Sequence, residues 1–145
     1  MNTKKQINRT SVKFYIYFLI AASFLGTSCQ KQKTDRLEGY WHLQHVTQCD
    51  TVPKTFLPGD NPGNYFAFFE DNTLSVTYVE GNNRTESFQG KWILESRNKN
   101  LTMNFLLIGK RYNRMYNVKK LTKKEIRLEY SDVNGDLWKF IFYKL

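Results

Sequence analysis

The feature that most constrains this chain is a period-two alternation of apolar and polar residues between residue 39 and the C-terminus. It is clearest in four alternate residues that have mostly polar neighbours: Phe88, Gly90, Trp92 and Leu94. A strand with one buried face has this period. Clusters of Asp, Asn, Gly and Ser separate the alternating segments, and these residue types favour turns. Because no segment after residue 38 has a convincing 3.6-residue period, the pattern predicts an all-β domain.

The spacing of the turns predicts eight strands. We expect them at residues 39–47, 64–70, 73–80, 85–95, 101–108, 115–121, 125–130 and 137–143. Eight short antiparallel strands suit an up-and-down barrel, which closes on itself and so has no exposed sheet edge. Outward positions carry charges such as Lys91 and Arg127, where a membrane-spanning barrel would need a continuous apolar band.

The first 28 residues have the character of an export signal. A basic segment precedes the apolar run 14–25, and Gly26-Thr27-Ser28-Cys29 follows. This arrangement resembles a bacterial lipoprotein signal of Bacteroidetes type, cleaved before Cys29, whose thiol then carries lipid such as palmitate. An uncleaved anchor and ordinary secretion with a chance cysteine are the alternatives. The expected organisation is a signal peptide at 1–28, a lipidated cysteine and polar tether at 29–36, and a barrel at 37–145.

This signal predicts a cell-envelope protein held to the membrane by its lipid anchor. The segment after Cys29 lacks the acidic cluster that resembles a surface-export signal, so we favour the periplasmic face of the outer membrane, with surface exposure as the alternative. Removing residues 1–28 leaves 18 basic and 13 acidic residues, a net charge of +5 instead of +9. Because much of the basicity belongs to the signal, no nucleic-acid partner is expected.

Several motifs carry a family resemblance. Residues 37–43 open the first strand with Gly39-x-Trp41, residues 65–74 form a Phe-rich strand and turn, and residues 88–94 repeat the first pattern with Gly90-x-Trp92. Their order resembles the lipocalin-like lipoproteins of Bacteroidetes over nearly all of 37–145. The resemblance implies a lipocalin-like, calycin-type barrel. The last strand carries Lys139 where lipocalins have an arginine near the first tryptophan.

We interpret both Gly-x-Trp motifs as structural, with glycine allowing close backbone approach while the indole fills space. The candidate ligand-binding mouth is the other end of the barrel, where the first, third, fifth and seventh connections meet. Its candidate residues are Phe56, Arg84, Arg111, Tyr112 and Arg114. Aromatic surface beside guanidinium groups suits a small amphipathic or anionic ligand. The alternative is that Phe56 caps a mostly filled core and the cations only line a solvated rim.

The sequence contains no catalytic signature, and we expect no enzyme, cofactor or metal site. His42 and His45 are expected on opposite faces of one strand, so they cannot chelate one metal together. His45 is expected on the face that carries Trp41 and Leu43. The one cysteine after Cys29, Cys49, is expected to be a small buried or half-exposed apolar residue. Thr51 follows Asp50 and precedes Val52, which resembles an O-glycosylation site of Bacteroidetes.

Two functions therefore remain open. The first is a lipid-anchored envelope binding protein for a small amphipathic or anionic ligand. The second is a structural or protein-interaction lipoprotein with a filled barrel, serving as a subunit of an envelope complex or as a hydrolase inhibitor.

Overall fold

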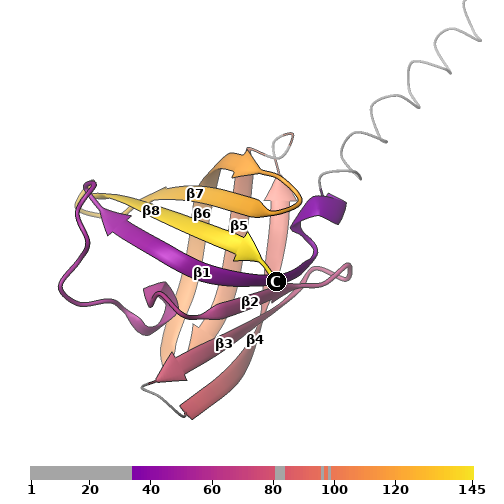
Figure 1. The fold of residues 1–145 in the computed structure, drawn as a ribbon, viewed down its shortest axis with the longest axis horizontal. Helices are drawn as coiled ribbons and strands as arrows, with labels where there is room; N and C mark the ends of the chain where they lie inside the picture. Colours follow the sequence, from indigo (N-terminus) through magenta and orange to yellow (C-terminus); the bar gives the residue numbers. More distant parts are fainter. Residues whose placement is uncertain (1–33, 81–83, 96, 98) are drawn as a thin grey trace, which may run out of the picture. The chain divides into compact units, whose positions relative to one another are not determined.

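The structure is a computed structural model that describes residues 34–80, 84–95, 97 and 99–145. Eight antiparallel strands close into one barrel in sequence order, and β8 returns to pair with β1 (Figure 1). The strands are β1 (Gly39–Gln48), β2 (Tyr65–Phe68), β3 (Thr73–Glu80), β4 (Arg84–Glu95), β5 (Asn100–Leu107), β6 (Lys110–Leu121), β7 (Glu125–Ser131) and β8 (Leu137–Lys144). The predicted all-β, up-and-down barrel is confirmed. The predicted signal and lipidation site lie outside the described residues.

The largest error in the predicted strands is the start of β6. The sequence suggested a long fifth connection that ended near Arg114, but β6 begins at Lys110. A tight turn at Ile108 and Gly109 makes this possible, because both residues adopt positive φ angles, 47° and 70°. Two successive residues with positive φ match the twist of the strands that flank a short hairpin turn. Arg111, Tyr112 and Arg114 are therefore strand residues, with alternate side chains on opposite faces of the barrel wall.

The barrel interior is filled mainly by apolar and aromatic side chains. Phe66 packs edge-on against both Phe105 and Phe142, and Phe68 packs edge-on against Trp92. The core includes the phenylalanines Phe66, Phe68, Phe105, Phe140 and Phe142, and Phe88 is partly buried against it. Burial of this aromatic surface is the main contribution to the stability of the domain.

Trp41 and Trp92 lie towards one end of the barrel, which we call the entry end because the chain enters β1 there. Both indole N–H groups donate to backbone carbonyls: Trp41 to Leu37 at 2.6 Å and Trp92 to Phe69 at 3.1 Å. Their glycines serve different needs. Gly39 has a φ of 115°, whereas a Cβ on Gly90 would lie 2.4 Å from the Asn104 carbonyl oxygen. The two Gly-x-Trp motifs thus pack their tryptophans in the same way, but Gly39 is needed for its positive φ angle and Gly90 for close approach of the neighbouring strand.

A β-bulge in β1 corrects the prediction for His45. The register of β1 against β8 shifts between Leu43 and His45, so the alternation changes phase there. Trp41, Leu43 and Val46 are buried, and His45 is exposed on the outer surface. Sequence alternation missed this because a bulge inserts one residue without a compositional signature. His42 stacks on Tyr65 with ring centroids 4.8 Å apart.

Candidate functional site

The end opposite the entry end is covered by the long connection between β1 and β2, residues 49–64, which we call the β1–β2 loop. It contains a short 3-10 helix, η1 (Pro58–Asp60). Asn64 closes the loop: its side chain is fully buried, donates to the Pro58 carbonyl at 2.7 Å and accepts from the Val79 N–H at 3.4 Å. We call this end of the barrel the loop end.

The β1–β2 loop brings the Asp60 carboxylate into contact with the Arg114 guanidinium inside the barrel. Arg114 points inward from β6, and its two terminal nitrogens donate to the two oxygens of Asp60 at 2.5 and 3.0 Å. The Asp60 side chain is 2% exposed and that of Arg114 13% exposed. Parallel contacts of this kind are the strongest geometry for an arginine–carboxylate pair. The pair therefore fastens the loop to the barrel wall.

Tyrosine side chains surround this ion pair. The Arg114 guanidinium carbon lies 5.1 Å from the ring centre of Tyr112 and 4.9 Å from that of Tyr130, within the range of cation–π attraction. The Tyr112 hydroxyl accepts a hydrogen bond from the Gly59 N–H at 2.9 Å, and its ring stacks on Phe105. A Cβ on Gly59 would lie 2.7 Å from the Tyr112 ring, so only glycine fits there without displacing the tyrosine.

Burial opposes the charge on Asp60 and raises the pKa of its carboxyl above the ordinary value, although Arg114 acts in the opposite direction. Burial also opposes the charge on Arg114, but its contacts with Asp60 and the Tyr116 hydroxyl outweigh that effect and raise its pKa. Burial raises the pKa of Tyr116 as well. Arg114 is thus a firmly charged cation at the edge of an apolar interior, and burial imposes a desolvation cost on the charged form of Asp60.

The structure separates the five residues of the candidate mouth. Tyr112 and Arg114 face the interior together, and Phe56 packs against the core from the β1–β2 loop. Arg111 lies on the opposite face of β6, exposed on the outer surface beside Leu106, its partner in β5. Arg84 is the first residue of β4, and its backbone pairs with Glu80.

The sequence analysis named Arg114 among the mouth residues but did not predict its pairing with Asp60. Alternation could have placed Arg114 inward, because Tyr112, Arg114 and Tyr116 alternate along one face of a strand. An inward arginine favours a buried acidic partner, but no local pattern singles out Asp60, which lies 54 residues away. The contact of Tyr130 with Arg114, by contrast, depends on how β6 and β7 pack together, which the sequence pattern does not indicate.

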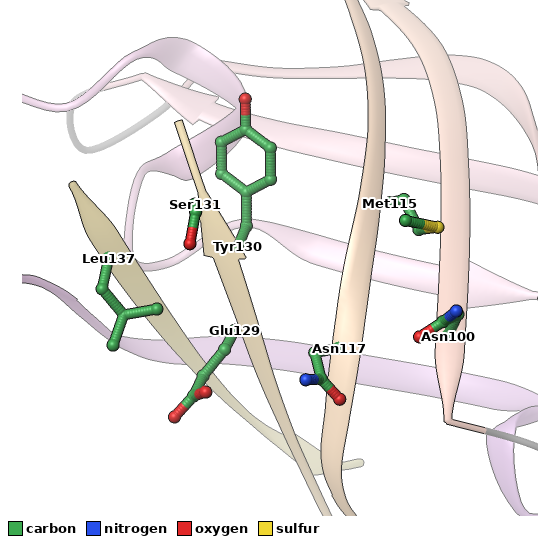
Figure 2. A pocket seen from close by; sticks show the side chains of 7 residues that line it. All are labelled: Asn100, Met115, Asn117, Glu129, Tyr130, Ser131 and Leu137. Carbon is green, nitrogen blue, oxygen red and sulfur yellow. The ribbon is translucent and has the colours of Figure 1, made fainter. Parts of the chain in front are cut away.

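A pocket of about 340 Å³ lies where β6 and β7 separate (Figure 2). The two strands pair from Asn117 to Leu121 of β6, whereas β6 pairs with β5 all the way from Lys110. The residues that line the pocket are Asn100, Met115, Asn117, Glu129, Tyr130, Ser131 and Leu137. Tyr130 belongs both to this pocket and to the surroundings of Arg114. Met115 and Asn117 alternate along β6 with the inward Arg114 and Tyr116, so the pocket lies on the outer side of the barrel wall.

Comparison with known proteins identifies the family. Residues 37–128 match the lipocalin-like domain. The chain belongs to the lipocalin-like domain family. A lipocalin-like protein from Bacteroides uniformis is similar in structure, with a TM-score of 0.56 and 18% identity over 76% of this chain and 99% of that chain. An uncharacterized protein from Bacteroides eggerthii has a TM-score of 0.53 and 15% identity over 74% and 98% of the two chains. Among curated proteins, none matches this chain.

The structure shows which basic residue lies near the first tryptophan. The sequence suggested Lys139, but Lys139 forms an ion pair with Asp50 and pairs with Thr47 of β1. The residue at the tryptophan is Lys144, whose ammonium lies 5.2 Å from the ring centre of Trp41 and donates to the Glu38 carbonyl at 2.6 Å. The end of β8, and not its middle, thus supplies the cation at the entry end.

The turn after β1 holds two further predicted residues. Cys49 is exposed and has a φ of 48°, so its predicted role as a buried or half-exposed apolar residue is wrong. Thr51 is exposed, and its hydroxyl donates to the Gln48 carbonyl at 2.9 Å. Its O-glycosylation stays a prediction. In the part of the chain that the structure describes, no helix is long and apolar enough to cross a membrane.

Proposed function

We propose that this protein is a lipid-anchored binding protein of the cell envelope that takes a small amphipathic anion at the loop end of its barrel. The observation that carries the proposal is the largely buried Arg114, set between the rings of Tyr112 and Tyr130. A guanidinium can hold a carboxylate or phosphate by two parallel hydrogen bonds, and the surrounding rings suit an apolar chain. Phe56 and Tyr112 of the predicted mouth fit this site, and Arg111 belongs to the outer surface.

The proposed lipid anchor would lie near the entry end of the barrel, opposite the proposed ligand site. Cys29 precedes the first described residue by five positions, which is at most about 17 Å of extended chain. Residues 34–37 form a helical turn directly before β1 at the entry end, with Leu37 buried under Trp41. A lipid on Cys29 would keep the entry end close to the membrane. The loop end, with Arg114, would then be the end farther from the anchor, where soluble or shuttled ligands arrive.

A second function is favoured by the contacts of the loop itself. The β1–β2 loop already satisfies Arg114 with Asp60 and Tyr112 with Gly59, and the interior is packed with aromatic rings. A barrel sealed in this way suits a structural or protein-interaction lipoprotein whose outer surface does the binding. In that case Asp60 and Arg114 would serve stability only.

Native mass spectrometry of residues 30–145, exported in the native host without the lipid anchor, tests the first proposal. We expect a reproducible small-molecule adduct that is lost on denaturation, and a matched Arg114→Met variant that carries less of it. A bare polypeptide mass for both proteins would favour the interaction function. Crosslinking in intact cells followed by partner capture would then be the next step.

A further inference from the structure

We propose that the entry end of the barrel binds the surface of an anionic lipid bilayer through its own side chains. The contact is made by a rim of exposed apolar and basic residues, which we call the entry rim. Its members are Tyr40, Phe69, Lys123, Lys124 and Leu145. This contact is additional to a lipid on Cys29 and does not require it. It is also separate from ligand binding, which the proposed function assigns to the loop end.

Backbone hydrogen bonds and a ring contact make the entry rim one continuous surface. The Leu145 N–H donates to the Tyr40 carbonyl at 3.0 Å, and the Tyr40 ring packs edge-on against Phe69 with centroids 6.3 Å apart. On the other side of Leu145, the Lys144 N–H donates to the Lys124 carbonyl at 3.0 Å. The rim therefore runs from the turn between β6 and β7 through the end of β8 to β1 and β2, beside which the C-terminus lies (Figure 1).

The apolar members of the entry rim add little to the core. Tyr40 is 59%, Phe69 38% and Leu145 72% exposed. Beside them on the outer wall, His42 stacks on Tyr65, which is also exposed. Contiguous exposed apolar surface on a folded domain indicates contact with a membrane or with another protein.

The kind of side chain on this wall favours a membrane. Trp41 and Leu43 are buried, so Tyr40 and His42 point outward, and Tyr65 lies opposite His42 in β2. Tyrosine rings suit a bilayer interface, because the ring enters the apolar layer while the hydroxyl stays among the headgroups. The outer face of β6 and β7 differs, since it carries the ion-paired residues Lys119, Lys120, Glu125, Arg127 and Glu129. The barrel thus has one aromatic outer face and one charged one.

The lysines of the entry rim favour anionic lipid headgroups. Lys123 and Lys124 are successive exposed residues of the turn between β6 and β7. Lysines beside exposed apolar groups are the combination by which peripheral proteins bind anionic bilayers. The exposed acids Glu70 and Asp71 follow Phe69 at the other end of the rim. We therefore expect the lysine side of the rim to determine the preference for anionic lipid.

The direction of the chain favours the same occupant. The described residues begin at Thr34, and residues 34–37 form a helical turn whose last carbonyl, that of Leu37, accepts from the Trp41 indole. The preceding segment therefore joins the barrel at the entry end. A lipid on Cys29 would hold the entry rim close to the same bilayer. Two linked contacts with one membrane bind more strongly than either alone, because the second is intramolecular.

Vesicle flotation of residues 30–145 without a lipid anchor tests the contact. This segment contains the whole closed barrel and its core. The probes are vesicles of phosphatidylcholine alone and vesicles with equal amounts of phosphatidylcholine and phosphatidylglycerol. We expect wild type to bind the mixed vesicles, and Tyr40→Ser with Phe69→Ser to lower the partition coefficient by about tenfold. The matched control is Leu106→Ser with Ile108→Ser, which removes two exposed apolar side chains at the loop end and should leave binding unchanged.

A pair of lysine variants tests the charge. Each lysine near an anionic surface contributes a factor of about five to the partition coefficient. Lys123→Gln with Lys124→Gln should therefore weaken binding to the mixed vesicles by about twentyfold and leave binding to phosphatidylcholine unchanged. Lys54→Gln with Lys110→Gln removes the same charge from the loop end and should change binding by less than about twofold, because screening limits the reach of those charges.

A measurement on wild type keeps the test decisive if a variant unfolds. With a nitroxide-labelled lipid headgroup in the mixed vesicles, we expect broadening of the amide NMR signals of Tyr40, Phe69 and Lys124, and none at Ile108. Absence of binding to both kinds of vesicle, equal losses in the rim variants and their controls, or broadening at the loop end would each overturn the proposal. A protein would then be the occupant of the entry rim. None of these results affects ligand binding at Arg114, which native mass spectrometry tests separately.

Discussion

The ion pair at the loop end makes a quantitative prediction about stability. Asp60 is 2% and Arg114 13% exposed, so removing either one leaves its partner as a poorly hydrated charge. Breaking a buried pair in this way costs about 3 kcal/mol or more of the free energy of unfolding. For a domain of this size that loss corresponds to a fall in Tm of about 12 °C. Asp60→Asn and Arg114→Met should each show it.

The double variant should be much less damaged than the two single ones. Removing both charges leaves no unpaired ion, so its loss should be about 1 kcal/mol, and the coupling energy should exceed about 2 kcal/mol. Urea unfolding followed by tryptophan fluorescence measures all four proteins. Additive losses, or single losses below about 0.5 kcal/mol as for an exposed pair, would refute the argument that this contact is buried and closes the barrel.

The pH dependence of the free energy of unfolding of Arg114→Met tests the same contact through the titration of Asp60. Asp60 titrates near 3.8 when unfolded and higher when folded, so between those values the folded protein binds more protons. The free energy of unfolding therefore falls as pH rises through that interval. Loss of the opposing cation should raise the folded pKa further and widen the interval. The stability deficit of Arg114→Met should shrink between pH 7 and pH 4, and a deficit that grows on acidification would contradict the assignment.

Three further predictions concern single residues. Gly90→Ala should lower the free energy of unfolding by about 3 kcal/mol in urea titrations, because its Cβ would lie 2.4 Å from the Asn104 carbonyl oxygen. Tyr112→Phe leaves the Gly59 N–H without its acceptor and should cost about 1 to 2 kcal/mol by the same assay, with faster tryptic cleavage of the β1–β2 loop. Cys29→Ser should abolish the incorporation of labelled palmitate into the protein in growing cells, and a wild-type protein that takes up no label would exclude the lipid anchor.

Much of the barrel could be predicted from the sequence because strand alternation is a local signal. The eight strands, their order and the inward phenylalanines all follow from period-two burial and turn chemistry. The errors arise where backbone geometry changes without a change of composition. Because of the bulge after Leu43, His45 lies on the outer surface and not on the predicted inner face. Because of the tight turn at Ile108 and Gly109, Arg111 lies in a strand and not in the predicted loop.

The candidate site was only partly predictable for a different physical reason. Tyr112 and Arg114 were found because they lie near the end that carries the long loop. Their partner Asp60 is 54 residues away, and nothing local records that contact. The same holds for Lys144 and Trp41, whose pairing depends on barrel closure between β8 and β1. The Lys144–Trp41 contact follows from the register of the closed sheet, and the Asp60–Arg114 contact from the path of the β1–β2 loop.

The most direct test of the account is a ¹³C NMR titration of the Asp60 carboxyl carbon with pH, in wild type and in Arg114→Met. The account predicts a pKa above 3.8 in wild type and a further rise in Arg114→Met, because the buried carboxyl then lacks its cation. A wild-type pKa at or below 3.8, or a pKa that Arg114→Met leaves unchanged, would contradict the ion pair at the centre of this account.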